Sequence, residues 1–180
     1  MKTQPKSGKI DVEIDEFVPC LRNTQTGEIV DTVVKEITDR GVLKQYTKDN
    51  GWYINWKDVP KDCKVCALQL KDDDSVQGLV AFRVEKQNMA VYGHWAVAAP
   101  NNRGTGKEFT GVGGHLFAIM AEESVKAGYD GFMYGKAANE TVLKHYVDTL
   151  GAVHIGSLRF FIDEKAAHKL LDEYTFEWVK

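Results

Sequence analysis

Three glycines in four positions stand directly ahead of a helical pattern in the stretch EFTGVGGHLFAIMAEE, residues 108–123. They are Gly111, Gly113 and Gly114. Peptide N–H groups at a helix start have no partner within the helix, and the helix dipole places partial positive charge there. Because glycine has no side chain, a large anion such as a pyrophosphate could reach these amides closely. A tight strand-to-helix turn without a ligand would explain the same residues equally well.

The two common phosphate-binding motifs do not match these glycines. A P-loop requires Gly-Lys followed by Ser or Thr, whereas Gly106-Lys107 is followed by Glu108. A dinucleotide fingerprint requires G-x-G-x-x-G, and Leu116 stands where its third glycine belongs. The residues alone therefore leave open both an anion site and a plain turn.

The elements that must position these residues are marked by a change of period. Alternating patterns predict strands over 64–70, 75–85 and 89–100, and the short turn KQN makes the last two an antiparallel hairpin. Apolar residues then recur at helical spacing over 112–127, and Gly128 stands where a C-terminal cap belongs.

Further elements are expected on both sides of this central part. A hairpin is expected around the turn formers NTQTGE, and a short helix followed by a loop over 39–56. The later elements are a buried strand, a helix, two short strands and a final helix, at 131–137, 139–152, 152–163 and 163–176. The order predicts an α/β mixture that does not repeat β-α-β from its start.

Length and composition predict one soluble domain. The chain has 180 residues, 43% of them hydrophobic, and a net charge of −3. That charge disfavours nucleic acid as a partner, because neutralising phosphates takes a surplus of Lys and Arg. The apolar runs are too short to span a bilayer and the N-terminus has no apolar signal-peptide core, so no membrane partner is expected and the predicted location is cytoplasmic.

Cysteines and aromatic residues upstream of the hairpin each allow two interpretations. Cys63 and Cys66 form a lone C-x-x-C within a strand pattern, where neither a redox helix nor a second ligand pair for zinc is present. Small buried thiols are expected, and no metal site. Trp52, Tyr53 and Trp56 could line a ligand cleft, although such aromatics more often pack in a core.

Glu108 to Gly113, EFTGVG, follow a strand pattern and open a helix. Downstream, GFMYGKAANETVLKHYVDTLGA carries Asn139, Tyr146 and an LGA ending. In these residues and their order, from about Val76 to Phe161, the chain resembles the GNAT superfamily of N-acetyltransferases, which use acetyl-coenzyme A as co-substrate. The family motif [QR]-x-x-G-x-[GA] falls on Glu108 to Gly113. The resemblance implies a central, mostly antiparallel, twisted sheet with helices on both faces. It divides one domain into an N-terminal elaboration (1–60), a core (about 63–162) and a C-terminal helix and tail (163–180).

The resemblance also implies roles for particular residues. The backbone at Gly111, Val112, Gly113 and Gly114 would bind the pyrophosphate, and Asn139 would hydrogen-bond the pantetheine arm. A backbone N–H near Ala96 or Val97 would support the oxyanion, and Tyr146 would protonate the departing thiolate. Glu108 departs from the family's Gln or Arg, and the inserted Arg103 or Lys107 could supply the missing positive charge. Asn139 could instead be a simple N-cap and Tyr146 a core aromatic.

The base and the acceptor are less defined. His94 and Glu85 fall on one alternating face of the hairpin with Tyr92 between them, so either could take the proton of an attacking amine. A lone histidine on a strand more often has a structural role, and water could relay the proton instead. The acceptor is expected to be a small-molecule or peptide amine. A non-catalytic acyl-coenzyme A sensor and a partner-binding module, with the aromatic C-terminal tail as a homodimer contact, are the alternatives.

Overall fold

A computed structural model describes residues 9–180. Within that range one nine-stranded sheet has the order β10-β11-β9-β7-β6-β5-β4-β12, with β1 also paired to β7, and β3-β2-β8 form a small second sheet. The strands are β1 (Lys9–Asp11), β2 (Leu21–Asn23), β3 (Ile29–Val30), β4 (Thr32–Glu36), β5 (Lys64–Leu70), β6 (Val76–Glu85), β7 (Ala90–Ala98), β8 (Phe109–Thr110), β9 (Met133–Lys136), β10 (Val153–His154), β11 (Arg159–Ile162) and β12 (Glu177–Trp178). The fold class is therefore mixed α/β, as predicted.

The three central strands follow their alternating sequence pattern. β4, β5, β6 and β7 are antiparallel neighbours, which confirms the predicted central hairpin. The register between β6 and β7 shifts at Ala81, which pairs with Trp95, while Phe82 pairs with Gly93. His94 is therefore the extra residue of a β-bulge, a feature that re-aims side chains.

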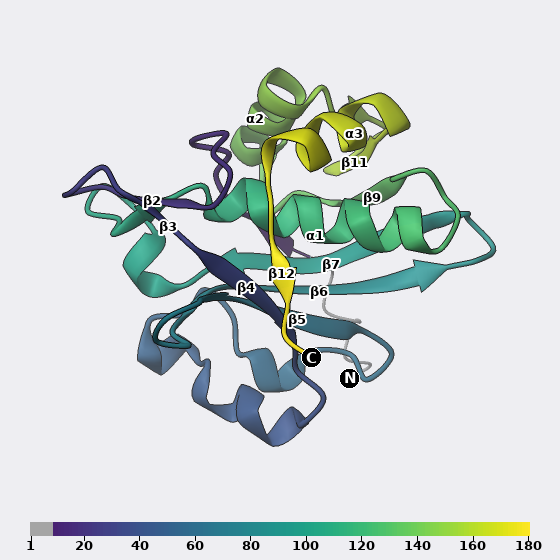
Figure 1. Cartoon of the computed structure of the whole chain (residues 1–180). Coiled ribbons are helices and arrows are strands. Elements are labelled where there is room, and N and C mark those ends of the chain that lie inside the picture. The colour runs from purple at the N-terminus through teal and green to yellow at the C-terminus, as the bar shows by residue number, and fades with distance from the viewer. Residues whose placement is uncertain (1–8) are drawn as a thin grey trace.

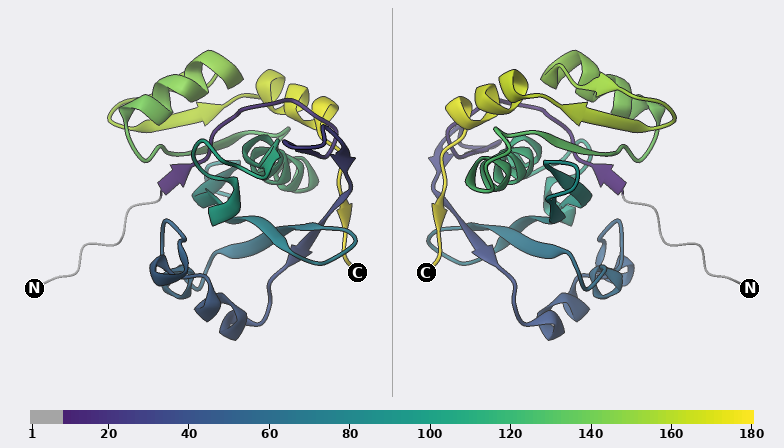
Figure 2. Two further views of the ribbon diagram at one scale, coloured as in Figure 1. Left: turned by 90° about the vertical axis from the view of Figure 1, so that its left-hand side faces the viewer. Right: turned by 90° about the vertical axis from the view of Figure 1, so that its right-hand side faces the viewer.

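Helices cover both faces of the sheet, but they are of different kinds. The α-helices are α1 (Val112–Lys126), α2 (Glu140–Leu150) and α3 (Glu164–Glu173), and their apolar residues join one core cluster. The opposite face is covered by the 3₁₀ helices η1 (Arg40–Gln45), η2 (Lys48–Asn50) and η3 (Trp56–Asp58), where a short helix and a loop had been predicted. Figure 2 shows these two coverings on opposite sides of β6 and β7. A fourth 3₁₀ helix, η4 (Pro100–Asn102), follows β7.

The helix ends use the residues that the sequence marks. Asn139 caps α2 by accepting a hydrogen bond from the Val142 amide at 2.9 Å, and Gly151 ends that helix in a left-handed conformation. Asp163 caps α3 in the same way through the Ala166 amide. No helix within residues 9–180 is both long and apolar enough to cross a membrane.

Near both ends of the described residues, strands pair with the sheet in ways that the sequence did not predict. The hairpin of β2 and β3 was expected, but β1 leaves that region and pairs in parallel with β7. β12 pairs in parallel with the edge strand β4, and Figure 1 shows the two side by side. Both pairings join segments far apart in sequence, which local periodicity does not encode.

The parallel strands β7 and β9 diverge, and β1 lies in the gap. They pair from Val91 to Gly93, and beyond this point β7 pairs with β1 instead. The side chain of Ile10 fills the space between the two strands and is fully buried. A Cβ atom on Gly93 or Gly135 would lie 2.9 or 2.6 Å from the Ile10 Cδ1 atom, so both glycines accommodate this side chain.

Candidate functional site

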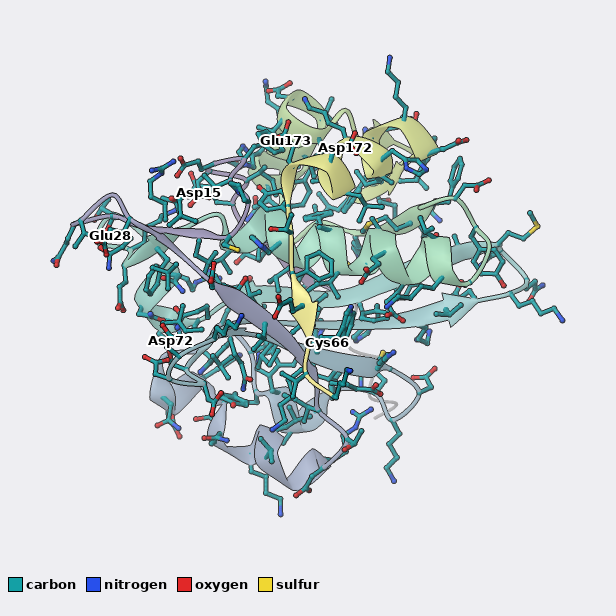
Figure 3. The ribbon with its side chains drawn as sticks, viewed as in Figure 1. Asp15, Glu28, Cys66, Asp72, Asp172 and Glu173 are labelled. Carbon is teal, nitrogen blue, oxygen red and sulfur yellow. The ribbon has the colours of Figure 1, made fainter. Side chains whose placement is uncertain are left out.

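The start of α1 forms an anion cradle, by which we mean the backbone of residues 111–114 together with Arg103 and Lys107. Gly111 has a φ of 96°, a left-handed conformation that favours glycine, and it turns the chain from β8 into α1. Its amide donates to the Asp15 carboxylate at 2.9 Å. The acceptor belongs to residues 9–16, which we call the N-terminal strap. Figure 3 shows Asp15 beside the N-terminal end of α1.

Lys107 holds two acids of the strap. Its ammonium group donates to Glu13 at 2.7 Å and to Asp15 at 3.0 Å. Burial acts to lower the pKa of Lys107, but these hydrogen bonds outweigh it and the pKa is raised. The hydrogen bond from Lys107 in turn lowers the pKa of Glu13. The positive charge predicted for the inserted loop is therefore present at the helix start, and here it is neutralised by carboxylates of the same chain.

Arg103 completes the charged set on the other side of the strap. It pairs with Asp11 at 2.8 Å, and its guanidinium lies 5.0 Å from the centre of the Tyr53 ring. A cavity of about 150 Å³ lies between the strap, Arg103, Lys107 and the first residues of α1. Tyr53 is half-buried at this edge, whereas Trp52 and Trp56 belong to the core cluster under the 3₁₀ helices.

The two helical glycines of the motif accommodate different neighbours. A Cβ atom on Gly113 would lie 2.1 Å from the Glu13 carbonyl oxygen, so this glycine allows the strap backbone to approach. A Cβ atom on Gly114 would lie 1.8 Å from the Tyr174 hydroxyl. The missing side chain of Gly114 therefore makes room for Tyr174. The predicted contact of the Gly114 backbone with pyrophosphate stays a prediction. Val112 is buried at the first position of α1.

The strap also engages the backbone expected beside a pantetheine arm. Ile10 pairs with Ala96 and Asp11 with Val97 in the parallel β1–β7 ladder. On its other side the Ile10 carbonyl accepts from the Ala138 amide at 3.1 Å, next to Asn139. Asn139 itself caps α2, which was one of its two predicted roles.

Tyr146 lies at the bottom of the same gap. Its ring is fully buried, and its hydroxyl donates to the Val12 carbonyl at 2.8 Å and accepts from the Val12 amide at 3.0 Å. Burial raises the pKa of this phenol, which keeps it protonated. Seven residues separate Tyr146 from Asn139, and both lie near the strap.

The predicted bases lie on the opposite face of the sheet from α1. Glu85 is hydrogen-bonded to Tyr134, Asn88 and Arg83. Burial acts to raise the pKa of Glu85, but these hydrogen bonds and the charge of Arg83 prevail and lower it. Arg83 lies 4.7 Å from the centre of the Tyr92 ring. Glu85 is thus an ionised but engaged carboxylate.

His94 lies beside Tyr92, and the centres of the two rings are 6.0 Å apart. Tyr92 in turn lies beside Arg83, which is hydrogen-bonded to Glu85. The imidazole is 6% exposed, and neither ring nitrogen has a hydrogen-bond partner among the described residues. Burial, and then the charge of Arg83, lowers the pKa of His94, so the ring is neutral at physiological pH. The structure therefore brings His94, Tyr92 and Glu85 to one face, as the alternation predicted, and separates them from Tyr146 by the sheet.

Sequence reasoning missed several residues of the site. The acids of the strap alternate with buried Ile10, Val12 and Ile14, a strand signal that was assigned to the N-terminal hairpin region. Asn102 is buried and holds the inserted loop through Gln77 and the Phe109 amide. Glu108, the departure from the family motif, is exposed and accepts from Asn101 at 2.9 Å.

The cysteines take no part in this site. Cys63 and Cys66 are buried free thiols, as predicted, and burial raises their pKa values to about 11 and about 12. Thiols with such pKa values are not nucleophilic near neutral pH. Among residues 9–180, no group of three or more His, Cys, Asp or Glu side chains is placed to hold a metal ion.

Comparison with known proteins gives limited similarity. No protein-family model and no curated protein matches the chain. A cAMP-binding acyltransferase from Mycobacterium smegmatis superposes with a TM-score of 0.43 at 15% identity, covering 87% of this chain and 56% of that one. This chain thus spans little more than half of that protein. A protein described as a streptothricin acetyltransferase from Bacillus anthracis, in complex with acetyl-coenzyme A, superposes with a TM-score of 0.41 at 15% identity, covering 79% and 96%. At these values neither similarity assigns an activity, so the interpretation depends on the geometry of the site.

Proposed function

We propose that the protein binds acyl-coenzyme A along the groove between β7 and β9 and transfers the acyl group, acetyl in the first instance, to a primary amine. The observation that carries this proposal is the anion cradle. The Gly111 amide, Lys107 and Arg103 bind carboxylates there. A diphosphate would offer acceptor oxygens of the same kind to the same donors. The ordered motif by which the chain resembles the GNAT superfamily supports the same ligand.

The course of the strap supports a route for the rest of such a ligand. β1 and β7 are parallel, with Asp11 paired to Val97 and Lys9 paired to Trp95. The strap backbone therefore runs along β7 from Val97, near the cradle, back to Trp95. Trp95 is the neighbour of His94 at the β-bulge. An extended ligand with its anionic end at the cradle would therefore direct its other end toward His94, on the face where Tyr92 and Glu85 also lie.

The proposed reaction is a direct transfer. The amine nitrogen attacks the thioester carbonyl, a C–N bond forms and the C–S bond breaks. The nitrogen loses a proton to a base and the thiolate gains one, so the products are an amide and free coenzyme A. His94 fits the base better than Glu85 does, because its imidazole is neutral and unpartnered while Glu85 already accepts three hydrogen bonds. An amide near Ala96 or Val97 would support the oxyanion. Tyr146 and His94 lie on opposite faces of the sheet, so Tyr146 would supply the thiolate's proton with the thioester placed in the gap between β7 and β9.

Calorimetric titration with acetyl-coenzyme A and with S-acetyl-pantetheine, which lacks the diphosphate, tests the ligand. The proposal predicts saturable, salt-sensitive binding of the first compound and at least about 10²-fold weaker binding of the second, because only the first has charges for the cradle. Free-thiol release with a panel of primary amines then tests the transfer. Equal affinity for both compounds would show that the cradle does not bind the diphosphate.

A second candidate follows from the occupation of the groove by the strap. The Tyr146 hydroxyl, the cradle and the β7 edge are all engaged by residues 10–15. If that arrangement were permanent, the chain would be a non-catalytic module that keeps the fold and binds a partner. Absence of both binding and thiol release, in the wild-type protein and in variants with a weakened strap, would favour this second candidate.

A further inference from the structure

We propose that the N-terminal strap is an intramolecular competitor for the coenzyme: residues 9–16 close the groove in the free protein and must leave it before acyl-coenzyme A binds. This inference rests on the proposed function, and it adds regulation of the same site. The strap contacts the cradle, the β7 edge and the Tyr146 hydroxyl, to each of which that function assigns a ligand contact. Its carboxylates stand in for phosphate oxygens, and its backbone stands in for the extended arm.

The charges show the match most directly. Asp11, Glu13 and Asp15 contribute three carboxylates to the cradle, and Arg103 and Lys107 provide the two cations. Asp15 also accepts from the amide of Gly111. A coenzyme diphosphate would compete with these carboxylates for the same two cations and the same amide.

Backbone contacts make the competition steric as well. The Glu13 carbonyl lies where even a methyl group on Gly113 would collide with it, so no ligand atom fits between this carbonyl and Gly113. The Tyr146 hydroxyl is hydrogen-bonded to both the amide and the carbonyl of Val12. The Ile14 amide donates to the His145 Nε2 atom at 2.8 Å. The ligand could reach these groups only after the strap has moved.

The strap has a defined pivot. The Glu16 carbonyl accepts from the Tyr174 hydroxyl at 2.6 Å, and Phe17 packs on the Tyr174 ring with 6.1 Å between the ring centres. Val18 is buried. These contacts fix the chain just after the strap, so a displacement of residues 9–15 would pivot at Glu16.

Displacement of the strap from the groove costs free energy, and this cost lowers the expected affinity for acyl-coenzyme A. Ile10, Val12 and Ile14 are at most 6% exposed, and displacement would transfer all three from the core to water or to another surface. The open state is then a minor population, and the apparent dissociation constant is the intrinsic value divided by that fraction. Weak binding by the wild-type protein, strengthened by changes that loosen the strap, is the expected result.

Matched charge variants of the full chain test this competition. The strap variant is Asp11→Asn, Glu13→Gln and Asp15→Asn. The control is Glu28→Gln, Asp72→Asn and Asp172→Asn, which makes the same change in charge at exposed positions. Because weakened ion pairs raise the open fraction, the strap variant should bind acetyl-coenzyme A about tenfold more tightly than the wild type, and the control should not.

Hydrogen exchange gives a second readout that does not depend on the variants. The amides of Val12 and Ile14 are both bonded across the groove, so their exchange in the wild-type protein should accelerate when acetyl-coenzyme A is added, while amides of β5 and β6 stay protected. Binding with equal affinity in all three proteins and unchanged protection of these amides would overturn the competition and leave the proposed function intact. No binding to any protein, with exchange showing that the strap variant has opened, would overturn the proposed function and the competition with it.

Discussion

Tyr146 has its hydroxyl bonded to both the amide and the carbonyl of Val12, so in the closed protein this residue holds the strap. The same hydroxyl is the one to which the family resemblance gives the role of proton donor. A phenol can donate to a backbone carbonyl or to a thiolate but not to both at once. If the proposed function is right, the structural and catalytic roles of this residue belong to different states of the groove.

Tyr146→Phe should separate these roles. Removing the hydroxyl leaves the buried amide and carbonyl of Val12 without their partner, which costs about 1–3 kcal/mol of unfolding free energy. If the proposed function is right, turnover at saturating substrate should fall by roughly 10²-fold. Urea denaturation and a thiol-release assay measure the two effects, with Tyr129→Phe, in the turn after α1, as the control. Loss of stability with full turnover would assign the phenol to packing alone.

His94 is a buried polar residue whose ring nitrogens have no partner among the described residues. Because burial lowers the pKa of His94, the unfolded chain takes up a proton at a higher pH than the folded protein does. Stability should therefore be fully present above about pH 6.5 and fall as the pH drops toward the lowered pKa. An orphaned imidazole is poorly suited to a purely structural role, which supports its assignment as a base.

The substitution His94→Phe should leave the unfolding free energy unchanged or raise it by about 1 kcal/mol, because it removes an unsatisfied buried polar group. It should also reduce the loss of stability between pH 7.5 and 5.5, while His168→Phe on the exposed face of α3 should not. Urea denaturation at both pH values measures this. A marked destabilisation with an unchanged pH dependence would mean that the imidazole has a structural partner.

At the scale of elements, the sequence predicted those whose pattern is local. The strands predicted from a period of two over β6 and β7 and the helix predicted from a period of 3.6 over α1 were confirmed. Burial is not confined to one face of these elements, because most of their residues are buried. Gly111 was correctly placed at the turn into α1, where it has a positive φ. Asn139 was correctly placed as a helix cap.

What the sequence did not predict depends on contacts between distant segments. β1 lies more than 80 residues before its partner β7, and β12 more than 140 residues after its partner β4. The alternation of Ile10, Val12 and Ile14 shows that a strand forms, but nothing local identifies the edge with which it pairs. Occupation of the anion site by the chain's own acids was invisible for the same reason.

Two adjacent glycines allow the strap and the tail to be perturbed separately. Alanine at a helix position is favoured over glycine by about 1 kcal/mol, yet at these positions the new Cβ atom meets a neighbour. Gly113→Ala should push the Glu13 carbonyl away and speed exchange of the Val12 and Ile14 amides. Gly114→Ala should instead displace the Tyr174 hydroxyl and lower the melting temperature. Hydrogen exchange and thermal melts distinguish these results, and identical effects of the two variants would show that strap and tail move as one unit.

At the scale of the whole molecule, the first and last strands of the described residues, β1 and β12, complete the sheet at different places. The strap fills the gap between β7 and β9, and the tail covers the edge strand β4. Tyr174 connects them, because its hydroxyl donates to Glu16 at the pivot of the strap. An exposed sheet edge presents unpaired backbone groups, so the tail also protects β4 from pairing with other chains.

Trp178 is the residue that fixes this tail, and Trp178→Ala should lower the free energy of unfolding by about 1–3 kcal/mol. Its indole N–H donates to Glu122 of α1 at 2.7 Å, and the Lys126 ammonium lies 4.5 Å from the centre of its ring. The expected loss combines partial burial of a large aromatic side chain with this cation–π contact, and it is smaller than for a fully buried tryptophan because the ring is only half-buried. The matched control is Val179→Ala. The Val179 side chain is 46% exposed, and the variant keeps the backbone hydrogen bond from residue 179 to Val34.

Urea denaturation of both variants measures the difference in unfolding free energy. A change below about 0.5 kcal/mol for Trp178→Ala would mean that the tail leaves the β4 edge in solution without cost to the fold.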